Sequence, residues 1–138
     1  MVTAMILAGG VGSRVGAECP KQFIEVFGKP ILAYTIEIYQ KNSQVEAIEI
    51  VCHEDWIDYL KKMIKKYDLS KVRWITQGGK TFQESVINGM KYLKDKLNMD
   101  DIVMIHYGAA PFSSQHIIQD GIETVSYTHL TLPTNSRV

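Results

Sequence analysis

Residues 5–16 are Met5-Ile6-Leu7-Ala8-Gly9-Gly10-Val11-Gly12-Ser13-Arg14-Val15-Gly16, an apolar run that breaks into a glycine-rich loop. Pro20-Lys21-Gln22-Phe23 follows shortly after, so one Arg and one Lys lie seven positions apart. Glycines let a backbone approach phosphate groups and turn its N–H groups toward them, and cations neutralise the charge that builds up in phosphoryl-type transfer. The stretch predicts a triphosphate site, although its residue types alone also fit a tight strand-to-helix turn with two solvated cations.

Two common nucleotide-binding motifs do not fit this loop. A dinucleotide fingerprint, G-x-G-x-x-G, needs glycine at the position of Val15, and a P-loop needs Lys and then Ser or Thr after its last glycine, where the chain has Ser13-Arg14. A different signature does fit, namely L-A-G-G-x-G-x-R followed by P-K-Q-F. With this combination the chain closely resembles the nucleotidyltransferases that couple CTP to 2-C-methyl-D-erythritol 4-phosphate or ribitol 5-phosphate.

The composition is that of an ordinary globular protein. The 138 residues suit one domain, and 46% are hydrophobic and 22% charged. Fifteen basic residues balance fifteen acidic ones, which argues against a nucleic-acid partner. No apolar run approaches the roughly 20 residues of a membrane span. The N-terminus shows no recognisable signal peptide. The spacing of Cys19 and Cys52 fits neither a metal site nor a disulfide framework. We therefore expect a cytoplasmic protein with no membrane partner.

Apolar runs and helical periodicities alternate along the chain. Short apolar strands are expected at 3–7, 47–52, 72–76 and 101–106, and helices at 30–41, 55–67, 82–97 and roughly 115–125. This alternation predicts an α/β fold, a doubly wound, mostly parallel sheet of Rossmann-like type. Ligands of such sheets bind beyond the carboxyl ends of the strands, where the loops at 8–16, 52–54, 77–81 and 106–112 should meet.

The apolar positions of each helix predict which face it buries. The helix at 55–67 carries lysines opposite its apolar stripe, so these are expected to be a solvated face rather than a phosphate patch. Trp74 is expected to pack on the sheet. The helix at 82–97 begins with a Thr81/Glu84 capping box, which suggests backbone N–H groups that point outward. The expected buried positions of the other two helices are Ile31, Tyr34, Thr35, Ile38 and Tyr39, and Val86, Ile87, Met90, Leu93 and Leu97.

The family resemblance covers residues 2 to about 125, roughly the first half of a family member, and implies a reaction. A phosphate oxygen of the acceptor attacks the α-phosphorus of CTP, and pyrophosphate leaves. Arg14 and Lys21 match the pair that stabilises the transition state. Gly78, Gly79 and Ser85 match a second nucleotide element, which Val86, Asn88 and Gly89 complete, although Ser85 could equally be a helix-face hydroxyl. The other residues expected to hold the nucleotide are Leu7, Ala8, Gly9, Gly10, Gly12 and Gly108.

Three positions depart from the family pattern. His-Asp-Ala-x-Arg-Pro-Phe is usual after the fourth strand, and the chain has Tyr107 in place of the Asp and Ala110 in place of the Arg. Phe82 stands where an Arg is common. The family implies Mg²⁺ as a cofactor, which the missing Asp would help to hold because this hard ion prefers carboxylate oxygen; no metal-ligating residue is assigned. His106 is preserved, and at the end of a buried strand it is expected to be a hydrogen-bonded structural residue.

Several alternatives remain open at this stage. The expected partners are CTP and a polyol phosphate, and Gly28-Lys29-Pro30-Ile31 and Glu54-Asp55-Trp56 favour the ribitol phosphate branch. A nucleotidyltransferase that uses UTP or GTP, or a nucleotide-binding module without turnover, would also fit parts of the pattern. Residues 126–138 lack periodicity and family resemblance, so we expect the nucleotidyltransferase part to be residues 1–125 and the tail to be foreign or disordered. Full-length family members are expected to be homodimers.

Overall fold

A parallel sheet organises the chain. The computed structural model describes residues 1–9, 19–109, 115, 118 and 121–122. Its four-stranded sheet has the order β5-β4-β1-β6, with every neighbouring pair parallel. This arrangement confirms the predicted α/β fold with a parallel sheet. The strands are β1 (Val2–Ala8), β4 (Val45–Cys52), β5 (Val72–Gln77) and β6 (Ile102–Tyr107).

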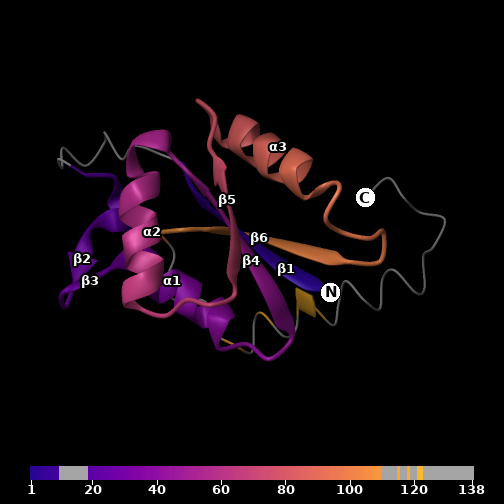
Figure 1. Cartoon of the computed structure of the whole chain (residues 1–138), viewed down its shortest axis with the longest axis horizontal. Coiled ribbons are helices and arrows are strands. Elements are labelled where there is room, and N and C mark those ends of the chain that lie inside the picture. The colour runs from indigo at the N-terminus through magenta and orange to yellow at the C-terminus, as the bar shows by residue number, and fades with distance from the viewer. Residues whose placement is uncertain (10–18, 110–114, 116–117, 119–120, 123–138) are drawn as a thin grey trace.

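Helices cover both faces of the sheet, as Figure 1 shows. Helices α1 (Ile31–Gln40) and α2 (Ile57–Lys66) pack on one face, and α3 (Phe82–Leu93) packs on the other. β1 has helices on both sides and is almost wholly buried, which explains why its sequence is a continuous apolar run. The shorter elements are η2 (Lys21–Phe23), β2 (Glu25–Val26), β3 (Lys29–Pro30) and η3 (Glu54–Trp56).

The predicted buried stripe of α1 is largely wrong. Ile31, Tyr34 and Ile38 are only half-buried, and the Tyr34 hydroxyl donates a hydrogen bond to the carbonyl oxygen of Val26 at 2.7 Å. The helix is apolar on more than one side, and the side that faces the sheet is centred on Leu32 and Ile36. The buried residues of α1 are Leu32, Ala33, Thr35, Ile36 and Tyr39.

The predicted stripe of α3 also needs correction. The helix ends at Leu93 instead of residue 97, and Ile87 and Met90 are 49% and 43% exposed. Its buried residues are Ser85, Gly89 and Leu93, spaced four apart. A Cβ on Gly89 would lie 2.9 Å from Cγ2 of Val51, so this glycine is what lets α3 approach the sheet closely.

Other expectations are confirmed within the described residues. The lysines of α2 are exposed, and Trp74 packs against the apolar cluster beneath α3. A two-residue turn with positive φ at Phe27 and Gly28 joins β2 to β3. Of the expected last helix, Gln115, Ile118, Gly121 and Ile122 are helical, while its remaining residues and the tail at 126–138 lie outside the described residues. No helix in the described part of the chain is both long and apolar enough to cross a membrane.

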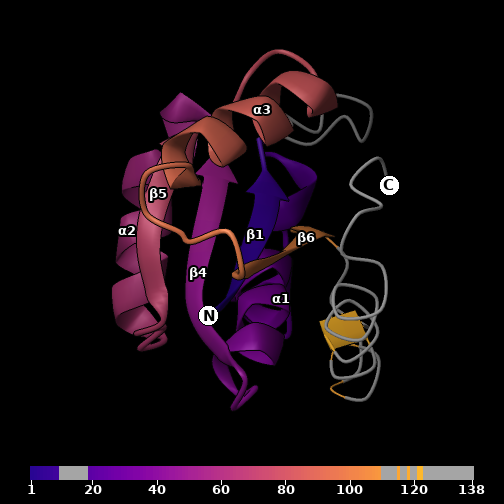
Figure 2. The same cartoon turned by 90° about the vertical axis from the view of Figure 1, so that its right-hand side faces the viewer.

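The strand order creates a switch point beside β1. The chain leaves β1 toward β4 on one side and later returns as β6 on the other. Ligands of doubly wound sheets bind at the carboxyl ends of such strands. In Figure 2, α3 runs across the arrowhead ends of β4 and β1, so the start of this helix is also near that edge.

Candidate active site at the carboxyl edge of the sheet

The Pro-Lys-Gln-Phe motif anchors Lys21 beside the end of β1. Gln22 is 6% exposed, and its Nε2 donates a hydrogen bond to the carbonyl oxygen of Ala8 at 2.8 Å. Phe23 is buried and stacks on Trp56, with ring centroids 4.9 Å apart. Gln22 and Phe23 therefore fix the backbone, while the Lys21 side chain stays exposed to solvent.

The two glycine loops meet at this edge. A Cβ on Gly78 would lie 3.2 Å from the Cα of Gly9 and 3.2 Å from the Oγ of Ser85. A Cβ on Gly9 would lie 3.0 Å from the same Ser85 oxygen. The absence of side chains at Gly9 and Gly78 thus lets the loop after β1 touch the loop after β5. The predicted residues Gly10, Gly12 and Arg14 lie outside the described residues.

The backbone amides of the second loop are bonded within the protein. The N–H of Gly78 donates to the Cys52 carbonyl at 2.9 Å, and the N–H of Gly79 donates to the Ser85 hydroxyl oxygen at 3.0 Å. The N–H of Lys80 donates to Oε2 of Glu84 at 2.7 Å. The amides of these three loop residues are therefore already paired, and they are separate from the N–H groups of the helix start that were expected to point outward.

The capping box forms in a modified way. The Oγ1 of Thr81 accepts a hydrogen bond from the N–H of Glu84 at 3.1 Å, as predicted. The Glu84 carboxylate binds the amide of Lys80 instead of that of Thr81. The helix start thus carries its own anion, which makes it a poor place for a phosphate.

Gly108 closes the other side of the switch point. Its N–H donates to the Leu7 carbonyl at 2.8 Å, and its carbonyl accepts a hydrogen bond from Thr35 Oγ1 at 2.9 Å. The preceding His106 is a structural residue, as expected, because its Nδ1 lies 2.5 Å from the hydroxyl of Tyr39. Burial raises the pKa of Tyr39 to about 12. The predicted residues Leu7, Ala8 and Gly108 are therefore neighbours.

Two aromatic rings occupy positions where the family pattern has charged groups. The rings of Phe82 and Tyr107 stack with their centroids 5.3 Å apart and an interplanar angle of 28°. The position where the family commonly has Arg and the position where it usually has Asp are therefore in contact in this chain. Sequence reasoning identified both departures separately, but it gave no sign that they touch.

The described residues do not fit a protein-held magnesium ion at this edge. Tyr107 offers a phenol where a carboxylate ligand was expected, and Phe82 offers no donor. Within residues 1–9, 19–109 and the four helical positions beyond, no group of three or more His, Cys, Asp or Glu residues could hold a metal ion. The same ranges leave Cys19 and Cys52 as free thiols.

Sequence reasoning missed a buried carboxyl group beneath α3. Glu49 is 0% exposed, and its Oε2 accepts a hydrogen bond from Thr76 Oγ1 at 2.7 Å. Its Oε1 has no hydrogen-bond partner. Burial raises the pKa of Glu49 to about 7, although Thr76 and the charge of Lys96 oppose this shift. The one available signal was an acidic residue inside the apolar run at 47–52.

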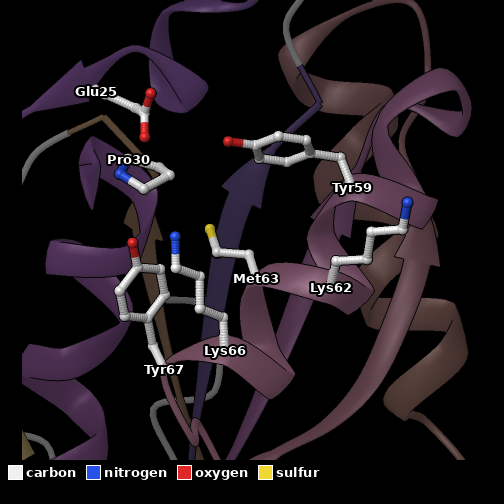
Figure 3. Close-up of a pocket in the computed structure, with 7 residues that line it drawn as sticks. All are labelled: Glu25, Pro30, Tyr59, Lys62, Met63, Lys66 and Tyr67. Carbon is white, nitrogen blue, oxygen red and sulfur yellow. The ribbon is translucent and has the colours of Figure 1, made fainter. Parts of the chain in front are cut away.

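A separate cavity of about 160 Å³ lies between α2 and the β2–β3 hairpin. In Figure 3 the Lys66 amine, the Tyr59 hydroxyl and the Glu25 carboxylate point into one space. None of the predicted nucleotide-binding residues lines this cavity, so we do not include it in the candidate site. Its lining residues are Glu25, Pro30, Tyr59, Lys62, Met63, Lys66 and Tyr67.

Relatives of known name share both sequence and fold with the chain. Ribitol-5-phosphate cytidylyltransferase of Vibrio parahaemolyticus is 42% identical over 126 residues, 91% of this chain and 53% of the relative. 2-C-methyl-D-erythritol 4-phosphate cytidylyltransferase of Clostridium kluyveri is 46% identical over 121 residues, 87% of this chain and 51% of the relative. The crystal structure of the latter enzyme from Francisella tularensis matches with a TM-score of 0.72 at 28% identity, over 93% of this chain and 53% of that one.

The chain thus spans about half the length of the curated relatives it matches. The two activities are not separated by identity, since relatives of both names lie within a few per cent of each other. The model of the family described as 2-C-methyl-D-erythritol 4-phosphate cytidylyltransferase (IspD) matches residues 2–132. With this match added to the glycine loops and the parallel sheet, the chain belongs to the IspD family of cytidylyltransferases.

Proposed function

We propose that the chain carries the nucleotide-binding part of a cytidylyltransferase. The enzyme transfers CMP from CTP to a small linear polyol phosphate, D-ribitol 5-phosphate or 2-C-methyl-D-erythritol 4-phosphate, and releases pyrophosphate. The observation that carries this proposal is the contact of Gly9 with Gly78 and Ser85 at the switch point of the sheet, with Lys21 anchored alongside. Family membership supports the reaction class.

The reaction needs no nucleophile from the protein. A phosphate oxygen of the acceptor forms a bond to the α-phosphorus of CTP, and the bond from that phosphorus to the bridging oxygen breaks as pyrophosphate leaves. Catalysis then consists of alignment and charge stabilisation. We assign the stabilisation of charge on the crowded phosphate to Lys21 and Arg14. Gly10 and Gly12 are assigned to the triphosphate, together with Leu7, Ala8, Gly9 and Gly108.

The charges of the two loops favour one orientation of the nucleotide. The second loop has its amides bonded internally and holds the Glu84 carboxylate, so it repels phosphate. It still has carbonyl groups and the Ser85 hydroxyl, which suit the polar edge of a pyrimidine. At the start of the first loop, the Ala8 carbonyl is bonded to Gln22, the neighbour of the exposed Lys21. We therefore place the base at Gly78, Gly79 and Ser85, and the triphosphate at the first loop.

Magnesium and the acceptor are less constrained by this chain. The family implies Mg²⁺, but the described side chains do not fit it, so no step above depends on the ion. For the acceptor we favour ribitol 5-phosphate, because Gly28-Lys29-Pro30-Ile31 and Glu54-Asp55-Trp56 are closer to that branch. The relatives are about twice as long as this chain. We also propose that a protein of that full length works as a homodimer.

Ligand-dependent thermal stability tests the nucleotide assignment. We expect CTP to raise the melting temperature of the chain more than UTP, GTP or ATP, with and without Mg²⁺. Lys21→Ala should weaken CTP stabilisation, whereas Lys62→Ala, which removes an exposed lysine of α2, should not. A chain that is not stabilised by CTP, or that responds equally to all four nucleotides, would contradict the proposal.

The aromatic residues at Phe82 and Tyr107 favour one alternative, a nucleotide-binding module without turnover. Pyrophosphate release separates the two functions. Release that depends on both CTP and a polyol phosphate supports the transferase. Stabilisation by CTP without any release on addition of either polyol phosphate, and without an effect of Mg²⁺, supports the binding module.

A further inference from the structure

We propose that Phe82 and Tyr107 form a stacking surface for the pyrimidine ring of the bound nucleotide. This inference rests on the proposed function. It assigns a base-binding role to two residues that differ from those of the family pattern. They are the first residue of α3 and the last residue of β6. Helix α3 and strand β6 follow one another in the chain, and the start of the helix meets the end of the strand through these two rings.

The position of the pair fits contact with a base. Phe82 follows Gly79 by three residues and precedes Ser85 by three, so its ring emerges within the second nucleotide element. Tyr107 directly precedes Gly108, whose N–H is bonded to the end of β1. One ring therefore belongs to the second nucleotide element, and the other lies one residue before the segment that is bonded to the end of β1.

The rings also have free surface to offer. Phe82 is 46% exposed and Tyr107 is 61% exposed although each stacks on the other. Aromatic rings stack in offset, near-parallel arrangements, and every nucleobase has a π-face that can extend such a stack. A two-ring surface beside a polar loop would bind a base by its face, while Ser85 and the loop carbonyls contact its edge.

The two replacements act at one place in the site. Tyr107 stands at the expected Asp and Phe82 at an expected Arg, and their side chains are in contact. A carboxylate at position 107 would lie against the electron-rich face of Phe82, whereas the Tyr107 ring stacks on it. With both changed, the site loses a charge pair at this position and gains apolar area. Recognition there shifts from charge to stacking.

The test compares a ligand that has a base with one that lacks it. Isothermal titration of the 138-residue chain with CTP and with inorganic tripolyphosphate measures both affinities. We expect Phe82→Leu and Tyr107→Leu each to weaken CTP binding about ten-fold, as loss of one base–aromatic stack does. Tripolyphosphate binding should be unchanged. Tyr107→Phe keeps the ring and should bind CTP nearly as the unsubstituted chain does.

Tyr92→Leu is the matched control, because Tyr92 is 40% exposed on α3 but lies near the other end of the helix. It should leave both affinities unchanged. Leucine variants that bind CTP normally, or that lose CTP and tripolyphosphate in parallel, overturn the stacking role. So does a change in oligomeric state without a change in CTP affinity, which would make the rings a docking surface. If the unsubstituted chain binds neither ligand, the proposed function fails instead.

Discussion

The two faces of the sheet differ in both size and chemistry. Beneath α1 and α2 the described chain has a hydrophobic core cluster of 17 buried residues. Beneath α3 the corresponding cluster has four, Met5, Leu7, Val51 and Leu93. The alternation of side chains places the buried Thr3 and Glu49 on this second face as well. One face therefore supplies most of the hydrophobic stabilisation, and the other combines thin packing with polar groups and the candidate site.

The difference suggests that one face mainly stabilises the fold and the other mainly positions the candidate site. The large cluster holds the strands in register, so the loops at their carboxyl ends have a rigid base. Helix α3 touches the sheet through small residues, and its N-terminal end carries the second glycine loop. Four substitutions test whether the faces differ as described.

Truncation of a core residue beneath α1 and α2 should have the largest effect. Ile50 is 0% exposed in β4, and Ile50→Ala should lower the free energy of unfolding by about 2–5 kcal/mol, because it removes buried methyl groups and leaves a cavity. Ile87→Ala makes the same change at a side chain of α3 that is 49% exposed, and it should cost much less. Urea denaturation of both variants measures the difference, and equal losses would contradict the asymmetry.

The buried carboxyl beneath α3 should make stability depend on pH. The pKa of Glu49 is about 7 in the folded chain and 4.5 for an ordinary Glu, so the folded state binds this proton more tightly. Stability from this group is therefore fully present below 4.5 and is lost as the pH rises through 7. The complete loss should be roughly 3–4 kcal/mol, since each pKa unit corresponds to about 1.4 kcal/mol. About 2–3 kcal/mol of it should fall between about pH 5 and about pH 8.

Glu49→Gln isolates this effect, because the amide keeps the shape and does not titrate. The difference in unfolding free energy between about pH 5 and about pH 8 should be smaller in the variant by the amount stated above. Denaturant titrations at the two pH values measure it. An identical pH dependence in both proteins would mean that Glu49 is already ionised in the folded chain.

The close approach of α3 should be sensitive to size at Gly89. A Cβ there would lie 2.9 Å from Val51 Cγ2 and 3.0 Å from Met5 Cε, so Gly89→Val must move the helix or its neighbours. We expect a loss of about 1–3 kcal/mol, typical of overpacking. Lys91→Val places the same β-branched residue at an exposed position of α3, where it crowds no neighbouring strand, and lowers helix propensity, which Gly89→Val does not. If Gly89→Val lowers the free energy of unfolding no more than the control does, the helix and its neighbours can move apart at little cost.

The helix cap should have the smallest effect of the four. Thr81→Ala removes the hydrogen bond from the Glu84 amide to Thr81 Oγ1 and should lower stability by about 1 kcal/mol. Thr81→Ser keeps an acceptor oxygen and should restore most of this loss. Thermal melting of the three proteins compares them, and a serine variant as unstable as the alanine variant would rule out capping as the cause.

The strands and their parallel arrangement were predictable because their patterns are local and strong, whereas the strand order was not predicted. Buried parallel strands appear as apolar runs, and the alternation with helices fixes how they connect. The faces of α1 and α3 were not predictable in this way. In α1 the apolar periodicity did not distinguish Leu32, Ala33 and Ile36, which are buried, from the half-buried apolar residues beside them. The buried stripe of α3 includes Ser85 and Gly89, which a hydrophobic periodicity ignores and the close approach of the helix to the sheet explains.

In the candidate site, too, some features follow from local sequence patterns and others depend on tertiary packing. The gathering of Gly9, Gly78 and Ser85 follows from the rule that loops after parallel strands share one edge. The anchoring of Gln22 on Ala8 and the stacking of Phe82 on Tyr107 depend on tertiary distances that no local pattern encodes. The internal bonding of the Gly79 and Lys80 amides likewise appears only when side chains are placed.

The strand order has a consequence for how copies of this chain meet. In the described sheet β5 and β6 are the outermost strands, so each has one row of backbone donors and acceptors without a neighbouring strand. Such a row is a template for lateral growth. On β6 the side chains of Ile105 and Tyr107 are 48% and 61% exposed, so apolar surface lies next to the unpaired edge of this strand. At high concentration we therefore expect chains to associate sheet to sheet along β6 before they do so anywhere else.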